Sequence, residues 1–192
     1  MRYPKVARQS LGRGRLRGMV GLHERSTEAD DRRTPGHWDG DLVMGRRPSA
    51  VATLVERSSR YLLLVALPNG VTAQAVQPAL RDALHQVPDQ LRRSLAWDRG
   101  REMATHAELS AQTGCPVYFC EPKSPWQRGT NENTNRLLRQ YLARSEDLPG
   151  REQQGLDELA ARLNNRPRRV LDWRTPAEVY AQATAVHAGA AP

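Results

Sequence analysis

Three short runs of strand-type residues follow one another closely, and they constrain the fold more than any other feature of the sequence. They cover residues 37–44, 50–56 and 61–67. The segments between them contain glycine and proline, or consecutive serines and arginines, which is typical of turns. Because connections this short join antiparallel neighbours, the three runs predict an antiparallel meander.

Helical and strand patterns alternate after this meander. Apolar residues from Ala75 to Val87 recur at helical spacing, and Thr72 is a suitable N-cap. A strand, a helix and a strand follow, which predicts a parallel crossover. The expected elements are a helix at 72–86, a strand at 91–97, a helix at 103–113, a strand at 117–120 and helices at 130–143 and 156–163. This is the order of the α/β ribonuclease-H-like fold, although other α/β folds share parts of it.

The chain carries a large excess of positive charge. Its 192 residues have a formal net charge of +8 and a pI near 10.3. Such an excess favours a polyanionic partner, and nucleic acid is the first candidate. All basic residues except Lys5 and Lys123 are arginines. Arginine suits phosphates and base edges, although the base composition of the gene explains the same preference.

The length fits one domain with additional arms. Residues 1–33 are rich in arginine and glycine without periodicity, and we interpret them as a flexible basic arm. A solvated linker without a function is the alternative. We expect residues 34–180 to form the domain and the Ala-rich residues 181–192 to form a flexible tail. No helix-turn-helix pattern is visible in the arm.

Nothing in the sequence indicates a membrane protein or a secreted one. No apolar stretch approaches the roughly 18 residues of a membrane span, and there is no secretory leader. Cys115 and Cys120 lack the four-ligand pattern of structural zinc, so we expect them to be reduced and buried. These observations predict a soluble, cytoplasmic protein without a membrane partner.

Asp98 is an acidic residue in a position suited to metal binding. It follows the apolar strand at 91–97, and open α/β sheets place ligand-binding groups at the C-terminal ends of their strands. Mg²⁺ prefers carboxylate oxygens, and three carboxylates are enough to hold the two ions of a phosphoryl-transfer site. An aspartate that only caps a turn or a helix is the structural alternative.

Asp41 lies inside the first strand in an otherwise apolar context. A charge in such a place is unfavourable unless it is paired or bound to a metal. Side chains alternate along a strand, so Asp39 faces the same side as Asp41. Strand geometry therefore does not choose between the two.

Glu132 stands at the start of the helix expected at 130–143. Successive helical residues are about 100° apart, which places Glu132 together with Arg136 and Arg139, opposite the apolar side of the helix. Glu132 therefore faces a groove or solvent beside two arginines that suit DNA phosphates. A favourable interaction with the helix dipole, or an ion pair with Arg136, explains the same position without a function.

Four segments resemble the IS thirty family of bacterial insertion-sequence transposases. They are GHWDGDLVMG at 36–45, WDRGREMATH at 97–106, YFCEPKSPWQRGTNENTNRLLRQYL at 118–142 and LNNRPRRVLDWRTPAEVY at 163–180. The run SPWQRGTNENTN is highly specific. The resemblance covers roughly residues 10–180.

The resemblance implies a core of the DDE transposase and retroviral-integrase type, with a mixed five-stranded sheet flanked by helices. It implies that Asp41, Asp98 and Glu132 are the catalytic and metal-binding acids, because 33 residues separate the last two, as in the family. It also assigns the ligand to Asp41 rather than Asp39, because the family's ligand follows the glycine. The implied cofactor is a pair of Mg²⁺ ions, for which Mn²⁺ can substitute.

The implied activity is metal-dependent DNA nicking and strand transfer, as in DNA transposition, integration and recombination. The implied partners are double-stranded DNA, as transposon ends and target, and further copies of the chain. We predict DNA contacts in the loop before the third acid and on the helix that follows it. These residues are Trp126, Gln127, Arg128, Arg136 and Arg139. A core position is the alternative for Trp126.

The N-terminus departs from the family, whose members carry a helix-turn-helix region before this core to recognise the element's ends. We expect that region to be missing, as in an isolated core, a truncated gene or the product of an internal start. Two alternative functions remain. One is a ribonuclease-H-type nuclease that hydrolyses without joining, and the other is an inactive fragment that binds DNA or oligomerises with full-length transposase.

Overall fold

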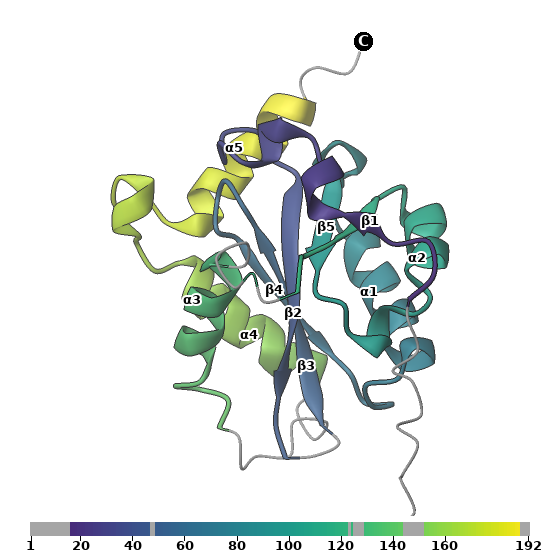
Figure 1. Ribbon diagram of the computed structural model, residues 1–192. Helices are drawn as coiled ribbons and strands as arrows, with labels where there is room; N and C mark the ends of the chain where they lie inside the picture. The colour runs from purple at the N-terminus through teal and green to yellow at the C-terminus, as the bar shows by residue number, and fades with distance from the viewer. Residues whose placement is uncertain (1–15, 47–48, 123, 125–128, 144–151, 189–192) are drawn as a thin grey trace, which may run out of the picture.

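A six-stranded mixed sheet forms the centre of the fold, and helices cover both of its faces (Figure 1). The computed structural model describes residues 16–46, 49–122, 124, 129–143 and 152–188. The strands are β1 (Val20–Gly21), β2 (His37–Met44), β3 (Ala50–Glu56), β4 (Leu62–Ala66), β5 (Ser94–Trp97) and β6 (Val117–Phe119). The α-helices are α1 (Ala73–His85), α2 (His106–Thr113), α3 (Gly129–Leu138), α4 (Gln153–Asn164) and α5 (Pro176–Ala188). The strand order is β1-β6-β5-β2-β3-β4.

The predicted meander is confirmed. β3 pairs antiparallel with both β2 and β4. Glu56 stabilises the turn between β3 and β4, because its carboxylate accepts hydrogen bonds from the amide and the hydroxyl of Ser59, each at 2.6 Å. The predicted parallel crossover is also confirmed, since β5 pairs in parallel with β6 and also with β2.

Two predicted elements begin later than the sequence pattern indicated. The strand expected from residue 91 starts at Ser94, because Asp89–Leu91 forms a 3-10 turn. The helix expected from residue 103 starts at His106, after another 3-10 turn at Arg101–Met103. Apolar residues in these turns are buried like those of the neighbouring elements, so the hydrophobic pattern does not mark the boundary.

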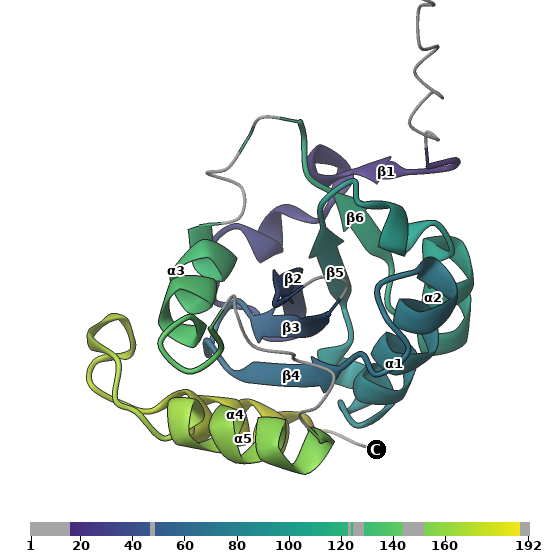
Figure 2. The ribbon, with the colours of Figure 1, turned by 90° about the horizontal axis from the view of Figure 1, so that it is seen from below.

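Two apolar cores lie on opposite faces of the sheet (Figure 2). α1 and α2 cover one face, and α3 and α4 cover the other. Each core uses the apolar stripe of its helices, as in α1, where three side chains at helical spacing are completely buried: Val76, Leu80 and Leu84. Alternation divides β2 between the cores, because Trp38 belongs to the first and Val43 to the second.

Residues 20–29 pack against the domain, in contrast to our expectation of a flexible arm up to residue 33. β1 pairs in parallel with β6 and adds a sixth strand to the five predicted. Arg25 is only 7% exposed and donates hydrogen bonds to Ser94 Oγ at 2.7 Å and to the Trp38 carbonyl at 3.3 Å. The anchor of this segment is a charged side chain rather than an apolar stripe, so hydrophobic periodicity does not reveal it.

The C-terminal helix α5 extends to Ala188, past residue 181, where we expected a flexible tail to begin. Its Tyr180 stacks on Tyr61 with ring centroids 4.2 Å apart, and it meets the edge of Trp38. These contacts attach α5 to the meander. Residues 1–15 of the expected arm and 189–192 of the expected tail lie outside the described residues.

The two cysteines are free and buried, as predicted. Burial raises the pKa of the Cys115 thiol to about 12, so this side chain stays protonated and unreactive at neutral pH. Among the described residues, no helix is long and apolar enough to cross a membrane.

Candidate active site

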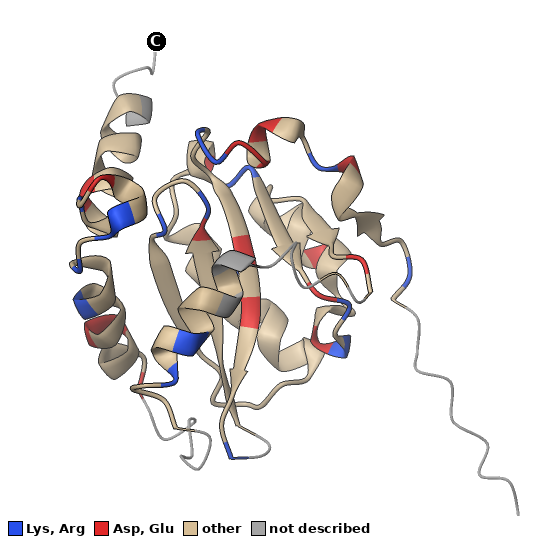
Figure 3. Cartoon of the chain, turned by 60° about the vertical axis from the view of Figure 1, so that its left-hand side comes forward, with Lys and Arg blue, Asp and Glu red and all other residues tan. Residues whose placement is uncertain are grey.

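Asp41 lies in β2, and Asp98 directly follows β5, the parallel neighbour of β2 near the middle of the sheet. The parallel register of β2 and β5 sets Asp39 opposite Ala96. The pairing ends there, and the same register extended by two residues would bring Asp41 level with Asp98, which directly follows β5. Both aspartates are partly exposed. Figure 3 shows acidic positions in the middle of the sheet and basic positions on the helix beside them.

Helix α3 fixes the side chain of Asp41. Nδ2 of Asn135 in α3 donates a hydrogen bond to Asp41 Oδ2 at 2.8 Å, and the Leu42 amide donates to Oδ1 at 2.9 Å. The two donors orient the carboxylate before any ligand arrives. Asn135 is 94 residues from Asp41 in the chain, so the sequence did not indicate this contact.

Asp98 caps the turn that follows β5. Its Oδ1 accepts a hydrogen bond from the Gly100 amide at 3.0 Å. The capping role that we considered from the sequence is therefore present. It does not conflict with metal binding, because an ionised carboxylate has about four acceptor positions on its two oxygens.

Asp39 is engaged inside the domain, and this separates it from Asp41. Its side chain is 3% exposed. It accepts hydrogen bonds from Arg57 Nη1 at 3.0 and 3.1 Å and from Arg25 Nη1 at 3.4 Å. Two buried guanidinium groups thus compensate the charge of Asp39. This arrangement favours Asp41 as the metal ligand of β2.

Glu102 is a further carboxylate near Asp41 and Asp98, and our reasoning from the sequence missed it. Burial raises its pKa above the usual range, and the negative charges of Asp98 and Asp41 contribute in the same direction. The indole Nε1 of Trp97 donates a hydrogen bond to Glu102 Oε1 at 3.0 Å, which opposes the shift. The available signal was its place four residues after Asp98 in the segment WDRGRE.

The ring of Trp97 packs directly on Gly40, the residue between the two aspartates of β2. A Cβ atom at Gly40 would lie 2.1 Å from Cζ3 of Trp97, far inside contact distance. Trp97 is completely buried and is held by Glu102. The absence of a side chain at Gly40 thus lets the Trp97 ring of β5 pack against the backbone of β2.

We expect Gly40→Ala to lower the free energy of unfolding by about 3 kcal/mol, because the added methyl group overpacks a closed core. For a chain of this size the melting temperature should fall by roughly 6–12 °C, as measured by circular dichroism. Gly155→Ala in α4 is the matched control. Its Cβ meets no atom within 4 Å, so the melting temperature should stay or rise. Equal melting temperatures for both variants would show that the indole has room to move.

The third predicted acid lies on α3. Glu132 is three residues before Asn135, and residues three apart are neighbours on a helix surface. Glu132 thus lies one helical turn before the residue that contacts Asp41, and its side chain is outside the described residues. The predicted apolar side of this segment is confirmed, since Leu138 and Leu142 are completely buried.

The predicted DNA-binding residues fall into two groups. Nη1 of Arg139 donates a hydrogen bond to the Met44 carbonyl at 2.6 Å, which ties the end of α3 to the end of β2. Arg136 is exposed on α3. The other three lie outside the described residues: Trp126, Gln127 and Arg128.

The carboxylates on β2 and β5 fit a hard divalent cation. Asp41 and Asp98 offer oxygen ligands from adjacent strands, and Mg²⁺ prefers such ligands together with water. Among the side chains that the structure describes, no three His, Cys, Asp or Glu converge as a complete metal site. A complete site therefore needs a ligand beyond these two aspartates.

Comparisons with known proteins place this chain in a family. The integrase core domain family matches residues 31–125, which include Asp41 and Asp98. The chain is 51% identical over 165 residues to the transposase InsI for insertion sequence element IS30A of Escherichia coli (strain K12), covering 86% of the chain and 43% of that protein. The chain belongs to the IS30 (IS thirty) family of transposases. The predicted resemblance is thereby confirmed.

Another relative agrees with this assignment. The transposase for insertion sequence element IS1086 of Cupriavidus metallidurans is 52% identical over 174 residues, which cover 90% of the IS30-family chain and 51% of the relative. The chain thus spans about half the length of these relatives.

The fold is that of an integrase core, as predicted. The catalytic core domain of BIV integrase superposes with a TM-score of 0.60 at 19% sequence identity. The match covers 79% of the IS30-family chain and 97% of the BIV domain. At this identity the likeness concerns the fold alone.

Proposed function

We propose that this IS30-family chain is a catalytic domain that nicks and joins DNA, with Asp41, Asp98 and Glu132 as its metal-binding acids. The nearness of Asp41 on β2 to Asp98 directly after the neighbouring strand β5 carries this proposal, since the charges of both aspartates act on the same Glu102. Helix α3 adds support, because it packs on β2 through Asn135 and contains Glu132.

The acids would hold two Mg²⁺ or Mn²⁺ ions, which supply charge stabilisation for the attacking and leaving oxygens of an in-line phosphoryl transfer. The protein's own contribution is to fix its ligands. Asn135 orients the carboxylate of Asp41, and the Gly100 amide orients that of Asp98. Trp97 packs on Gly40, between the strands that lead to the two aspartates. Preorganised ligands reduce the reorganisation required in the transition state.

Double-stranded DNA is the proposed partner, first as a transposon end and then as a target. The net charge of +8 supports this choice. Trp126, Gln127 and Arg128 are proposed to contact the strand near the acids. Pairing of two transposon ends requires more than one active site, so we propose that copies of the chain assemble on DNA. Chromosomal DNA as substrate places the protein at the bacterial nucleoid in the cytoplasm.

A joining assay tests this proposal. The chain is incubated with supercoiled plasmid and a labelled transposon-end duplex that carries a free 3′-hydroxyl. We expect labelled plasmid with MgCl₂ and none with EDTA or with a 3′-dideoxy end. Nicked plasmid without label would identify the ribonuclease-H-type nuclease instead. Neither nicking nor joining would identify the inactive fragment.

A further inference from the structure

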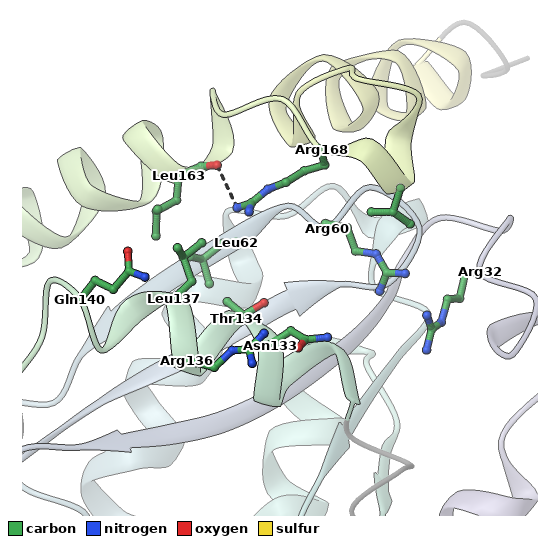
Figure 4. A pocket seen from close by; sticks show the side chains of 11 residues that line it. Arg32, Arg60, Leu62, Asn133, Thr134, Arg136, Leu137, Gln140, Leu163 and Arg168 are labelled. Carbon is green, nitrogen blue, oxygen red and sulfur yellow. Dashed lines mark hydrogen bonds between the residues drawn. The ribbon is translucent and has the colours of Figure 1, made fainter.

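A groove of about 760 Å³ lies along α3 (Figure 4). Its floor is apolar, with Leu62, Leu137 and Leu163. Of the described residues that line it, four are arginines and none is acidic. They are Arg32, Arg60, Arg136 and Arg168. These arginines come from four separate segments of the chain, so the fold has gathered them.

The backbone holds two of these arginines in an unusual conformation. Arg32 and Arg60 have φ angles of 58° and 62°, in the left-handed region that side chains other than glycine rarely occupy. Such conformations persist only where the surrounding structure maintains them, and they often mark functional positions. Ordinary solvated arginines require no such conformation.

The positive charge of the groove is only partly compensated by the protein. Burial lowers the pKa of Arg60, the neighbouring charges of Arg32 and Arg57 lower it further, and Asp39 and Glu56 oppose this shift. Burial and the charge of Arg166 likewise lower the pKa of Arg168. Nε of Arg168 is buried and, within the described residues, has no hydrogen-bond partner. An anion bound in the groove would raise the pKa of both Arg60 and Arg168 again.

We propose that this arginine groove binds the phosphate backbone of duplex DNA beside the catalytic acids. This inference rests on the proposed function and names the surface that holds its substrate. Guanidinium groups bind phosphates with two parallel hydrogen bonds, and Asn133 and Thr134 add polar groups at the rim. The described lining contains no aromatic ring, so it offers no stacking platform for unpaired bases. The contacts are therefore to the backbone and independent of base sequence.

The arginine groove and Asp41 contact the same helix. Asn135 of α3 donates a hydrogen bond to Asp41, and Arg136, about 100° further around the helix, lines the groove. An α-helix with its side chains is about 10 Å wide, so a duplex held in the groove lies within roughly one helix width of the acids.

Salt-dependent DNA binding tests the arginine groove. The affinity of the chain for a fluorescein-labelled 30-base-pair duplex is measured by anisotropy in EDTA between 50 and 300 mM KCl. For Arg168→Gln we expect a several-fold weaker affinity and a log–log salt slope that is smaller by about 0.9. In the double variant Arg60→Gln/Arg168→Gln the slope should decrease by about twice that amount. Arg32→Gln tests the same groove at an exposed side chain, where substitution does not threaten folding.

Arg81→Gln is the matched control. Arg81 lies on α1, which covers the opposite face of the sheet, and its loss removes the same charge. Its salt slope should equal that of the wild type. An equal slope for the Arg60→Gln/Arg168→Gln variant and the wild type would overturn the proposal. A decrease of the salt slope in Arg81→Gln equal to that in Arg168→Gln would also overturn it. So would a labelled polyglutamate that binds as tightly as DNA and depends in the same way on Arg60 and Arg168.

Asp98→Asn distinguishes failure of this proposal from failure of the proposed function. The arginine groove predicts that DNA binding by Asp98→Asn in EDTA still depends on Arg60 and Arg168 as in the wild type, whereas the proposed function predicts loss of joining. Normal salt slopes in the groove variants together with lost joining in Asp98→Asn would reject the groove alone. Reduced slopes together with intact joining in Asp98→Asn would reject the assigned acid alone.

Discussion

Asp98→Asn should reduce the Mg²⁺-dependent joining rate by about 10³-fold or more, and Asp41→Asn should have a similar effect. A neutral amide does not balance the charge of a metal ion, so several kcal/mol of transition-state stabilisation are lost. Each 1.36 kcal/mol corresponds to about a tenfold change in rate, which gives this magnitude. Initial rates of strand transfer from a 3′-hydroxyl transposon end provide the measurement.

Metal binding provides a second readout that does not depend on activity. MgCl₂ should raise the melting temperature of the wild type, because a ligand that binds only the folded state stabilises it. The increase should be smaller in both variants. Asp82→Asn is the control, since this aspartate of α1 is 65% exposed and lies on the other face of the sheet. A variant that joins DNA at the control's rate would remove its residue from the site.

The order of elements could be predicted because it depends on local patterns. Alternation and short turns define the meander, and the 3.6-residue period defines the helices. The same local pattern predicted the C-terminal end of β5, and Asp98 was identified because it directly follows that end. The boundaries at Ser94 and His106 could not be predicted, because 3-10 turns bury apolar residues without a distinct period.

The choice between Asp39 and Asp41 illustrates what local patterns leave open. Both aspartates face the same side of β2, and family resemblance was needed to favour Asp41. The structure adds a physical reason, since Arg25 and Arg57 converge on Asp39 from segments 14 and 18 residues away. Such convergence depends on tertiary packing. Gly40 and Glu102 escaped notice for the same reason, because their significance lies in their contacts with Trp97.

Asp39→Asn should lower the free energy of unfolding by about 3–5 kcal/mol, because Arg25 and Arg57 would remain buried without a full counter-charge. The side chains of Asp39 and Arg25 are each only 3% exposed, so water offers little compensation. Burial already lowers the pKa of Arg25, and Asp39 is the strongest influence that opposes this effect. Total stabilities of domains are about 5–15 kcal/mol, so the loss is large. Urea denaturation should show a lower midpoint with an unchanged slope.

Asp41→Asn is the matched control, because it makes the same chemical change two residues further along the same face of β2. Asp41 is partly exposed, and an asparagine keeps one of its two acceptor contacts, with Asn135 or with the Leu42 amide, so stability should change by only about 1 kcal/mol. The double substitution Arg25→Met/Asp39→Asn should lower the free energy of unfolding by less than the sum of the two single substitutions. It removes Arg25 together with Asp39, so that guanidinium is not left buried without a counter-charge. Wild-type stability in Asp39→Asn would contradict the ion-pair role and return Asp39 to consideration as a metal ligand.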